Sequence, residues 1–202
     1  MAIGDEERDW IRRSRQGEAH AYRHLVERYQ GQVHRLVSSL LGYQHGNVDD
    51  VVQEVFVKAY FSLKRFREDA GFATWIYRIA VNRARDEIRK ESRHVSLDTT
   101  LSGEAMQALK GLWDQASDEE KEASMASESL QRFVGQAITA LPEKLRTVVT
   151  LKDMEGLSYQ EVGQVLNRSV GTVKSRHSRA RQRLRSLLAP HLPDLQKQGS
   201  LS

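Results

Sequence analysis

The chain has 202 residues, of which 39% are hydrophobic and 29% charged, and it contains no cysteine. This composition is typical of a soluble globular protein with one large or two small domains, and it excludes disulfide and thiol chemistry. No apolar run approaches the ~20 residues of a transmembrane helix, and the acidic, polar start of the chain is unlike a signal peptide.

The formal net charge of +4 is distributed unevenly along the chain. Residues 1–93 have a net charge of +3, residues 94–128 a net charge of −6, and residues 129–202 a net charge of +7. Basic segments favour nucleic acid as a partner. The acidic stretch between them is interpreted as a linker, which is either a solvated spacer or a mimic of nucleic acid.

Residues 5–41 are predicted to form two helices separated at Gly17, the second with a long core-facing stripe that begins at Ala21. His20 and His24 have a spacing that can ligate a metal, but no third ligand and no HExxH pattern accompany them. We interpret them as exposed histidines and expect no metal and no cofactor.

The next predicted helix covers residues 47–64, with Asn47 as its N-cap and an almost complete apolar stripe. Its other side is polar and carries Asp49, Asp50, Gln53, Glu54 and Lys58. By itself, this side has the composition of an ordinary solvated helix face.

Residues 66–93 are predicted to form a loop at Gly71 and a helix from about Phe72. Aromatic residues here alternate with arginines, a pattern that suits single-stranded DNA because bases stack on rings and phosphates attract cations. The alternative is that the rings lie in the core and the cations on the surface. Composition alone favours this alternative.

Residues 94–128 show little periodicity and are predicted to be a partly flexible linker. Helical patterns resume over residues 129–151, Pro142 is predicted to open a helix, and Gly156 to end it. Residues 190–202 are predicted to be a flexible tail. No strand alternation and no internal repeat is present.

Residues 157–188 predict two short helices joined by a turn. Ser158 and Glu161 have capping-box spacing, and residues 167–169 are polar turn formers. The second helix carries six cations and no acid: Lys174, Arg176, Arg179, Arg181, Arg183 and Arg185. A helix-turn-helix that reads the DNA major groove has this pattern, and a surface for an acidic protein is the alternative.

Three segments together resemble the extracytoplasmic-function (ECF) group of bacterial sigma factors. They are DDVVQEVFVKAY, FREDAGFATWIYRIAVNRARDEIRKESR and LPEKLRTVVTLKDMEGLSYQEVGQVLNRSVGTVKSRHSRARQRLR. The resemblance covers roughly residues 8–93 and 129–188. It implies an all-α chain with a polymerase-binding and −10-reading domain (1–93), an acidic linker through the polymerase cleft (94–128), a −35-reading helix-turn-helix domain (129–189) and a tail (190–202).

The resemblance also implies three sets of site residues. Contacts to core polymerase would come from Asp49, Asp50, Gln53, Glu54, Phe56 and Lys58. Contacts to the melted −10 element would come from Arg67, Phe72, Trp75, Tyr77, Arg78, Asn82, Arg83, Asp86 and Arg89. Contacts to the duplex −35 element would come from Thr172, Lys174, Ser175, Arg176, Ser178, Arg179 and Arg183. Ser178 departs from relatives that carry a bulky aromatic there, which leaves the −35 preference open.

The partners implied by the resemblance are core RNA polymerase, promoter DNA and an anti-sigma factor. The chain would be a cytoplasmic monomer when free, or a 1:1 complex with an anti-sigma factor that can hold it at the inner membrane, without inserting itself. A stand-alone helix-turn-helix regulator is the alternative. An enzyme is not indicated, since the sequence has no nucleophile with a base partner, no phosphate-binding loop and no zinc spacing.

Overall fold

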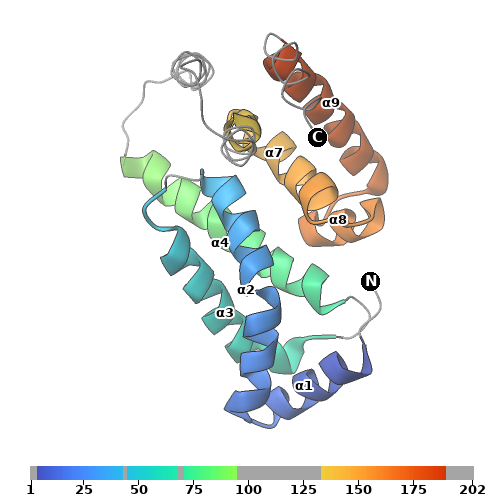
Figure 1. Ribbon diagram of the computed structural model, residues 1–202. Coiled ribbons are helices and arrows are strands. Elements are labelled where there is room, and N and C mark those ends of the chain that lie inside the picture. The colour runs from blue at the N-terminus through green and yellow to red at the C-terminus, as the bar shows by residue number, and fades with distance from the viewer. Residues whose placement is uncertain (1–3, 43–44, 68–70, 95–132, 190–202) are drawn as a thin grey trace, which may run out of the picture.

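The computed structural model describes residues 4–42, 45–67, 71–94 and 133–189. These parts of the chain are helical and contain no strand (Figure 1). The elements are α1 (Asp5–Arg15), α2 (Ala19–Leu41), α3 (Val48–Ser62), a short 3₁₀ turn η1 (Leu63–Arg65), α4 (Phe72–His94), a helical stretch over 133–139, α7 (Glu143–Val149), a π-helical turn η2 (Thr150–Met154), α8 (Tyr159–Leu166) and α9 (Val170–Leu188).

Helices α1 to α4 form an N-terminal unit, residues 4–94. Gly17 joins α1 to α2 with a φ of +92°, a conformation that favours glycine. The apolar stripe predicted for α2 is buried from Ala21 to Leu40, and it packs against α1, α3 and α4. The core of this unit is therefore the one that helical periodicity predicts.

Residues 133–189 form a C-terminal unit that ends in the predicted helix-turn-helix. The capping box of α8 is present, because Ser158 Oγ accepts from the backbone NH of Glu161 and the Glu161 carboxylate accepts from the backbone NH of Ser158. Asn167 ends α8 with a φ of +50°, and Ser169 caps α9. A Cβ on Gly163 would lie 2.8 Å from the Arg168 carbonyl oxygen, so the turn requires glycine at this position.

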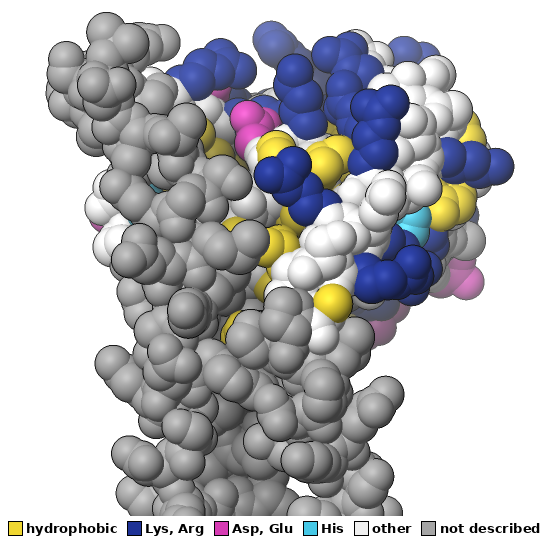
Figure 2. Space-filling view, turned by 90° about the horizontal axis from the view of Figure 1, so that it is seen from above, with side chains coloured by type: hydrophobic (Ala, Val, Ile, Leu, Met, Phe, Trp, Pro, Cys, Tyr) yellow, Lys and Arg dark blue, Asp and Glu magenta, His cyan; other side chains and the backbone are white. Residues whose placement is uncertain are grey.

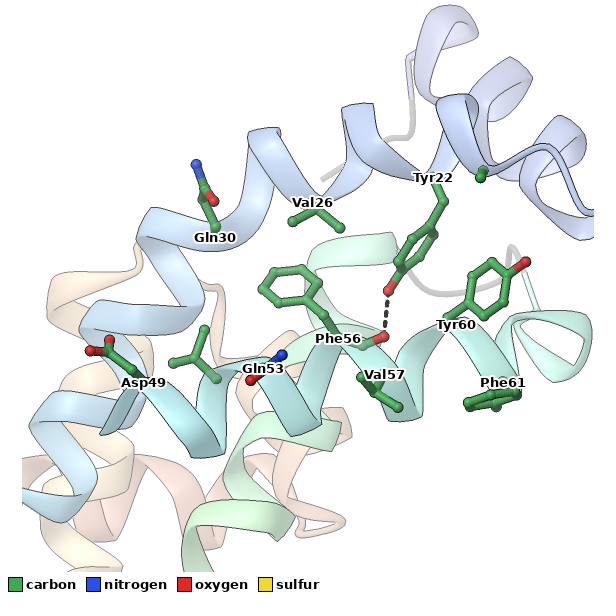
Figure 3. Close-up of a pocket in the computed structure, with 11 residues that line it drawn as sticks. Tyr22, Val26, Gln30, Asp49, Gln53, Phe56, Val57, Tyr60 and Phe61 are labelled. Atoms are coloured by element: carbon green, nitrogen blue, oxygen red, sulfur yellow. Dashed lines mark hydrogen bonds between the residues drawn. The ribbon is translucent and has the colours of Figure 1, made fainter. Parts of the chain in front are cut away.

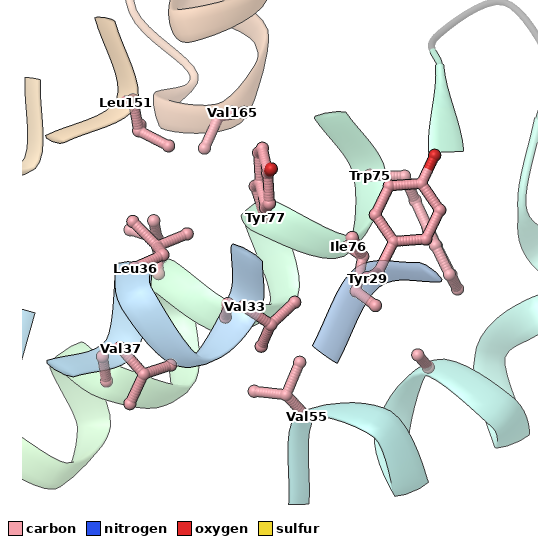
Figure 4. Packing of buried hydrophobic residues seen from close by; sticks show 14 of the residues in the cluster. Tyr29, Val33, Leu36, Val37, Val55, Trp75, Ile76, Tyr77, Leu151 and Val165 are labelled. Atoms are coloured by element: carbon pink, nitrogen blue, oxygen red, sulfur yellow. The ribbon is translucent and has the colours of Figure 1, made fainter. Parts of the chain in front are cut away.

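The two units share one hydrophobic core. Leu151, Leu157 and Val165 of the C-terminal unit belong to the same buried cluster as Leu36 and Ile76 of the N-terminal unit. Figure 4 shows Leu151 and Val165 lying across from Leu36 and Tyr77. Helix α8 packs on α4, and α7 packs on α2. The all-α fold with a C-terminal helix-turn-helix is confirmed, and the packing of one unit on the other was not predicted.

Hydrogen bonds supplement the apolar contact between the units. Arg146 Nη1 donates to the carbonyl oxygen of Leu40 at 2.6 Å, and the hydroxyls of Ser39 and Thr150 are 2.7 Å apart. Ser39 and Thr150 are fully buried, so their mutual hydrogen bond removes the cost of leaving either hydroxyl unpaired. The contact thus satisfies these polar groups that it buries.

Two local details differ from the predictions. Asn47 occupies the N-cap position of α3, but its side chain does not cap the helix; its amide donates to Glu87 Oε1 at 3.3 Å. Pro142 precedes α7 as its N-cap residue, and the helix then widens into η2 before Gly156 ends it with a φ of +71°. The linker predicted for residues 94–128 and the tail predicted for 190–202 lie almost wholly outside the described residues.

Candidate protein and nucleic-acid interfaces

A groove with an apolar lining runs between α2 and α3 (Figure 3). Tyr22 and Val26 of α2 form one wall, and the Tyr22 hydroxyl donates to the Phe56 carbonyl oxygen at 2.6 Å. Three large side chains of α3 that line the groove are exposed: Val57 at 50%, Tyr60 at 37% and Phe61 at 79%. Large apolar side chains exposed together on a monomer indicate a surface for a partner.

The residues of α3 predicted for polymerase binding lie on the outer side of this helix. Asp49, Asp50, Gln53, Glu54 and Lys58 are exposed, and both Asp49 and Gln53 line the groove. Phe56 is only 8% exposed, since its ring packs in the core and forms the floor of the groove. Asp49 and Gln53 therefore add polar groups beside the apolar lining of the groove, a combination found at many protein interfaces.

The sequence predictions missed Val57, Tyr60 and Phe61, which contribute most of the exposed apolar surface here. A signal was present, because Val57 and Phe61 are four residues apart and lie outside the apolar stripe that faces the core. Apolar residues on the solvated side of an amphipathic helix are a reason to expect a binding partner.

Glu54 of α3 and Arg83 of α4 form an ion pair on the surface between these helices. Arg83 also contacts Glu87 at 2.8 Å, and its side chain is only 18% exposed. The Arg83 guanidinium is paired with both acids and holds the pKa of Glu54 and of Glu87 below the ordinary range. Arg83, predicted to contact DNA, is therefore engaged in holding α3 against α4.

Helix α4 presents a row of exposed polar side chains to solvent. Arg78, Asn82 and Asp86 follow at intervals of four residues, and Arg89 continues the row. Asn82 has an amide that can both donate to and accept from a base edge. These four predicted residues are brought together on one accessible side of the helix.

The three aromatic residues predicted for the −10 site are buried. Phe72 is 1% exposed, Trp75 8% and Tyr77 3%. Phe66, Phe72 and Trp75 pack ring against ring, with centroids 5.1 to 5.6 Å apart. The structure matches the alternative interpretation, in which these rings belong to the core. Phe72 and Trp75 follow the inward side of α4, and Tyr77 is buried where α4 meets the C-terminal unit. As folded here, they offer little surface on which a base could stack.

Arg67 is exposed at the start of the loop before α4, and residues 68–70 of that loop lie outside the described part of the chain. Phe66, its neighbour, is buried, and its carbonyl oxygen accepts a hydrogen bond from Arg15. The segment that ends at Arg67 is therefore anchored to the core and to α1 through Phe66.

Helix α9 carries the predicted −35 residues on its outward side. Lys174, Ser175, Ser178, Arg179 and Arg183 are exposed, and Thr172 and Arg176 are half-buried. Lys and Arg side chains gather on the side of the molecule that carries α7 and α9, with few acids among them (Figure 2). The inward side, with Val173, His177 and Ala180, is buried. A cationic helix fixed to a scaffold by its apolar side can approach a DNA groove.

His20 and His24 lie edge to face on α2, with ring centroids 4.8 Å apart, and His24 stacks on Trp10. Among the described residues, no group of three or more His, Cys, Asp and Glu is arranged to hold a metal ion. None of the helices in this described part of the chain is long and apolar enough to cross a membrane.

Two family models match this chain. The model described as Sigma-70 region 2 matches residues 25–94, and the model described as Sigma-70, region 4 matches residues 134–184. The ECF RNA polymerase sigma-E factor of Escherichia coli (strain K12) is 40% identical over 188 residues, which cover 89% of this chain and 93% of that protein. The protein of the same name from Haemophilus influenzae is 37% identical over 180 residues, 89% of this chain and 94% of its own length.

Two solved structures resemble the fold over most of the chain. CnrH, in complex with the cytosolic domain of CnrY, has a TM-score of 0.65 and 27% sequence identity and covers 92% of this chain and 99% of its own. The sigma factor RpoE of Bartonella quintana, in complex with the anti-sigma factor NepR, has a TM-score of 0.60 and covers 83% of this chain and 96% of its own; at 21% identity it supports the fold alone.

Proposed function

Because this chain belongs to the extracytoplasmic-function family of RNA polymerase sigma factors, we propose that it binds core RNA polymerase and positions it at promoters through the surfaces on α3, α4 and α9. The chain is an alternative sigma factor that directs transcription initiation. It acts by binding and positioning, and the polymerase supplies the chemistry. One observation supports these roles: the same chain has an apolar groove between α2 and α3, a polar row on α4 and a cationic helix-turn-helix.

Core polymerase would dock on the groove between α2 and α3. Tyr22, Val26 and Phe56 line the groove, and the exposed Phe61 lies beside them. An amphipathic helix that lies in such a groove buries its apolar side there. Asp49 lines the groove and Asp50 is exposed beside it on α3, so these two acids would select a basic partner and fix its orientation. Glu54 is a weaker candidate for this contact because it is already paired with Arg83.

The melted −10 strand would lie along α4. Asn82 is the candidate for a base contact, and Arg78 and Arg89 are candidates for phosphate contacts. Arg67 is exposed where the described segment after η1 ends, and it is the candidate for a contact to a flipped base. Phe72 and Trp75 are left out of this set because they are buried against Phe66 within the N-terminal unit. Tyr77 is buried against the C-terminal unit, so it would become available only if the units separate.

The duplex −35 element would lie against α9. Lys174, Ser175, Arg176, Ser178 and Arg179 occupy the N-terminal half of the helix, which is the part of a recognition helix that contacts base edges. Thr172 and Arg183 flank them and are candidates for backbone contacts. Ser178 offers a small hydroxyl that can bond to any base, so it contributes little discrimination.

The chain cannot contact the −10 and −35 elements at the same time while its two units are packed together. Elements centred about 10 and 35 base pairs upstream are separated by about 25 base pairs, or roughly 85 Å of B-form DNA. Helix α8 packs directly on α4 and α9 packs on α8, so the two candidate DNA surfaces lie much closer together than that. Residues 95–132, at about 3.3 Å per residue, can span roughly 120 Å when extended. We therefore expect the units to separate when the chain joins polymerase.

An anti-sigma factor is the second proposed protein partner. The relatives CnrH and RpoE were solved with CnrY and with the anti-sigma factor NepR. The free chain would be a monomer, the inhibited chain a 1:1 complex, and both would lie in the cytoplasm with polymerase and DNA. A membrane-bound anti-sigma factor would hold the complex at the inner membrane without insertion of this chain.

Reconstituted transcription tests the proposal. The full chain mixed with core polymerase should give transcripts from specific start sites on genomic DNA fragments, which core polymerase alone does not give. A stand-alone helix-turn-helix regulator would instead bind duplex DNA tightly without polymerase and produce no transcript.

A further inference from the structure

A chain of hydrogen bonds runs beneath the cationic side of α9. His177 of α9 is buried, with 6% of its surface exposed. Its Nε2 lies 2.9 Å from both carboxylate oxygens of Asp153 in η2, and its Nδ1 lies 3.0 Å from the hydroxyl of Tyr159 in α8. Three consecutive elements of the C-terminal unit thus meet at one imidazole.

The partners of His177 assign its hydrogens. A carboxylate only accepts hydrogen bonds, so Nε2 must carry a hydrogen that it donates to Asp153. In the neutral imidazole, Nδ1 is then the acceptor, and the Tyr159 hydroxyl donates to it. Both ring nitrogens of His177 and the Tyr159 hydroxyl have a partner in this arrangement. The position and rotation of the Tyr159 ring are therefore fixed from within the protein.

The Tyr159 ring supports two cations. Lys174 Nζ lies 5.6 Å from the ring centroid and Lys152 Nζ lies 5.3 Å from it. An ammonium group near an aromatic face is attracted by the ring, which restricts a side chain that otherwise samples many rotamers. Lys174 is exposed on the outward side of α9, one turn before His177. A fixed ring at this place holds the Lys174 ammonium close to the surface that DNA would meet.

We propose that His177 is a positioning residue for duplex DNA binding, which acts through Tyr159 to hold Lys174 in place for a phosphate. It touches no DNA itself. A pre-positioned lysine loses less conformational freedom when it binds, so its contact contributes more affinity. This inference rests on the proposed role of α9 as the duplex reader, and it adds Asp153, Tyr159 and His177 to that reader.

Two substitutions separate positioning from packing. His177→Leu replaces the imidazole with an apolar group of similar size and removes the hydrogen bonds to Asp153 and Tyr159. His177→Gln offers an amide NH₂ to Asp153 and an amide oxygen to the Tyr159 hydroxyl, so it retains a donor and an acceptor. If His177 only fills space, the Leu variant should retain more affinity for DNA than the Gln variant. If His177 positions Tyr159, the Gln variant should retain more.

The experiment measures binding of the full chain to a short labelled duplex of mixed sequence, over a range of salt concentrations, with thermal denaturation as a check on folding. We expect Lys174→Ala to weaken binding. The slope of log affinity against log salt concentration should become shallower by the amount expected for about one phosphate contact. We expect His177→Leu to weaken binding about threefold and His177→Gln to retain most of the affinity. In the Lys174→Ala background, His177→Leu should have no further effect, since the two act on one contact.

The outcomes distinguish this inference from the proposed function. Additive effects of His177→Leu and Lys174→Ala, or a Gln variant as weak as the Leu variant, would overturn the positioning role alone. Tyr159→Phe provides an independent check, because it keeps the ring and removes the hydroxyl, and an unchanged affinity would also overturn that role. If Lys174→Ala changes neither the affinity nor its salt dependence, the assignment of α9 as duplex reader fails and the inference fails with it.

Discussion

The Tyr77 hydroxyl of α4 donates a hydrogen bond to Oε2 of Glu155, 3.0 Å away, across the contact between the two units. The Glu155 side chain is 2% exposed, and its other oxygen lies 3.6 Å from Nε of the half-exposed Arg35. Burial raises the pKa of Glu155, and burial also raises the pKa of Tyr77. Glu155 directly follows η2, the turn that also carries Thr150 and Asp153. This turn therefore links the N-terminal unit to the unit that carries the helix-turn-helix.

Glu155→Ala should weaken the contact between the units. The substitution leaves the buried Tyr77 hydroxyl without an acceptor and opens a small cavity, at a cost of about 1–3 kcal/mol. Because the contact is shared by both units, the free energy of unfolding of the whole chain should fall in urea denaturation. A resonance-energy-transfer pair with one dye in each unit should also report a larger separation. An unchanged separation and stability would show that the apolar contact alone holds the units.

The same residue predicts a pH dependence with a defined sign. A carboxyl whose pKa is raised by folding contributes stability below its ordinary pKa near 4.5, and that contribution is lost as the pH rises through the raised value. The closed arrangement should therefore become more stable as the pH falls through the raised pKa of Glu155 towards the ordinary value. Glu155→Gln is neutral and can still accept from Tyr77, so its stability should change less over this window. Parallel pH profiles for the two proteins would contradict the assignment.

A substitution in the groove between α2 and α3 should lower the affinity for core polymerase without lowering the stability of the fold. Phe61 is 79% exposed, so Phe61→Ala removes partner contact and little core packing. We expect affinity for core polymerase to fall by about tenfold, the size expected of an interface anchor. The melting temperature should stay within about 1 °C, because exposed positions contribute little to stability. Lys64→Ala, an exposed change two residues beyond the end of α3, is the matched control.

Loss of core binding with a matching loss of stability would show that Phe61 supports the fold. Full core binding by Phe61→Ala, Val57→Ala and the double variant would exclude this groove as the docking surface.

Asn82→Ala tests the row on α4. Asn82 is exposed, so the change should leave the fold and core binding intact. Initiation should fall by about tenfold to a hundredfold, since a base contact of this kind contributes about 1–3 kcal/mol. The measurements are transcription on linear templates and a core-binding titration. Weak initiation that is restored on templates with a pre-melted −10 region would place Asn82 in melting, and loss of core binding would place it in the docking surface.

Periodicity and capping chemistry predicted the helices, most of their bounds and the core stripe of α2, because each depends on residues close in sequence. The exposure of Asn82 and Lys174 followed from the same patterns. The contact between the units could not be predicted in this way. It depends on Leu151, Val165 and Glu155 meeting residues of α2 and α4 that are far away in the chain. The raised pKa of Glu155 is a consequence of that contact.

The predictions for Arg83 and Asn47 show a second limit. Both residue types fit the roles predicted for them, DNA contact for Arg83 from the family resemblance and helix capping for Asn47 from local sequence. In the structure, both side chains bind Glu87 instead. Glu87 is buried, and a buried carboxylate needs partners. The positions of the Arg83 and Asn47 side chains therefore follow from the buried Glu87 carboxylate, and local sequence does not reveal that Glu87 is buried beside them.

The turn of the helix-turn-helix predicts opposite effects at two glycines. Gly163→Ala would place a Cβ 2.8 Å from the Arg168 carbonyl oxygen, so the turn would have to shift, at a cost of about 1–3 kcal/mol. A Cβ on Gly171 in α9 would meet nothing within 4 Å, and Gly171→Ala should be neutral or stabilising because alanine favours helix. Thermal denaturation of both variants checks this. Equal effects of the two changes would contradict the tight approach at Gly163.

The central claim is that the chain is a promoter reader that works only as part of polymerase. Its most direct test compares promoter binding by the full chain alone, by core polymerase alone and by the two together, on fragments selected from genomic DNA by the combined proteins. The account predicts a specific footprint over both promoter elements, with transcripts, only when both proteins are present. A tight, specific footprint from the chain alone, unchanged when core polymerase is added and without transcripts, would contradict it.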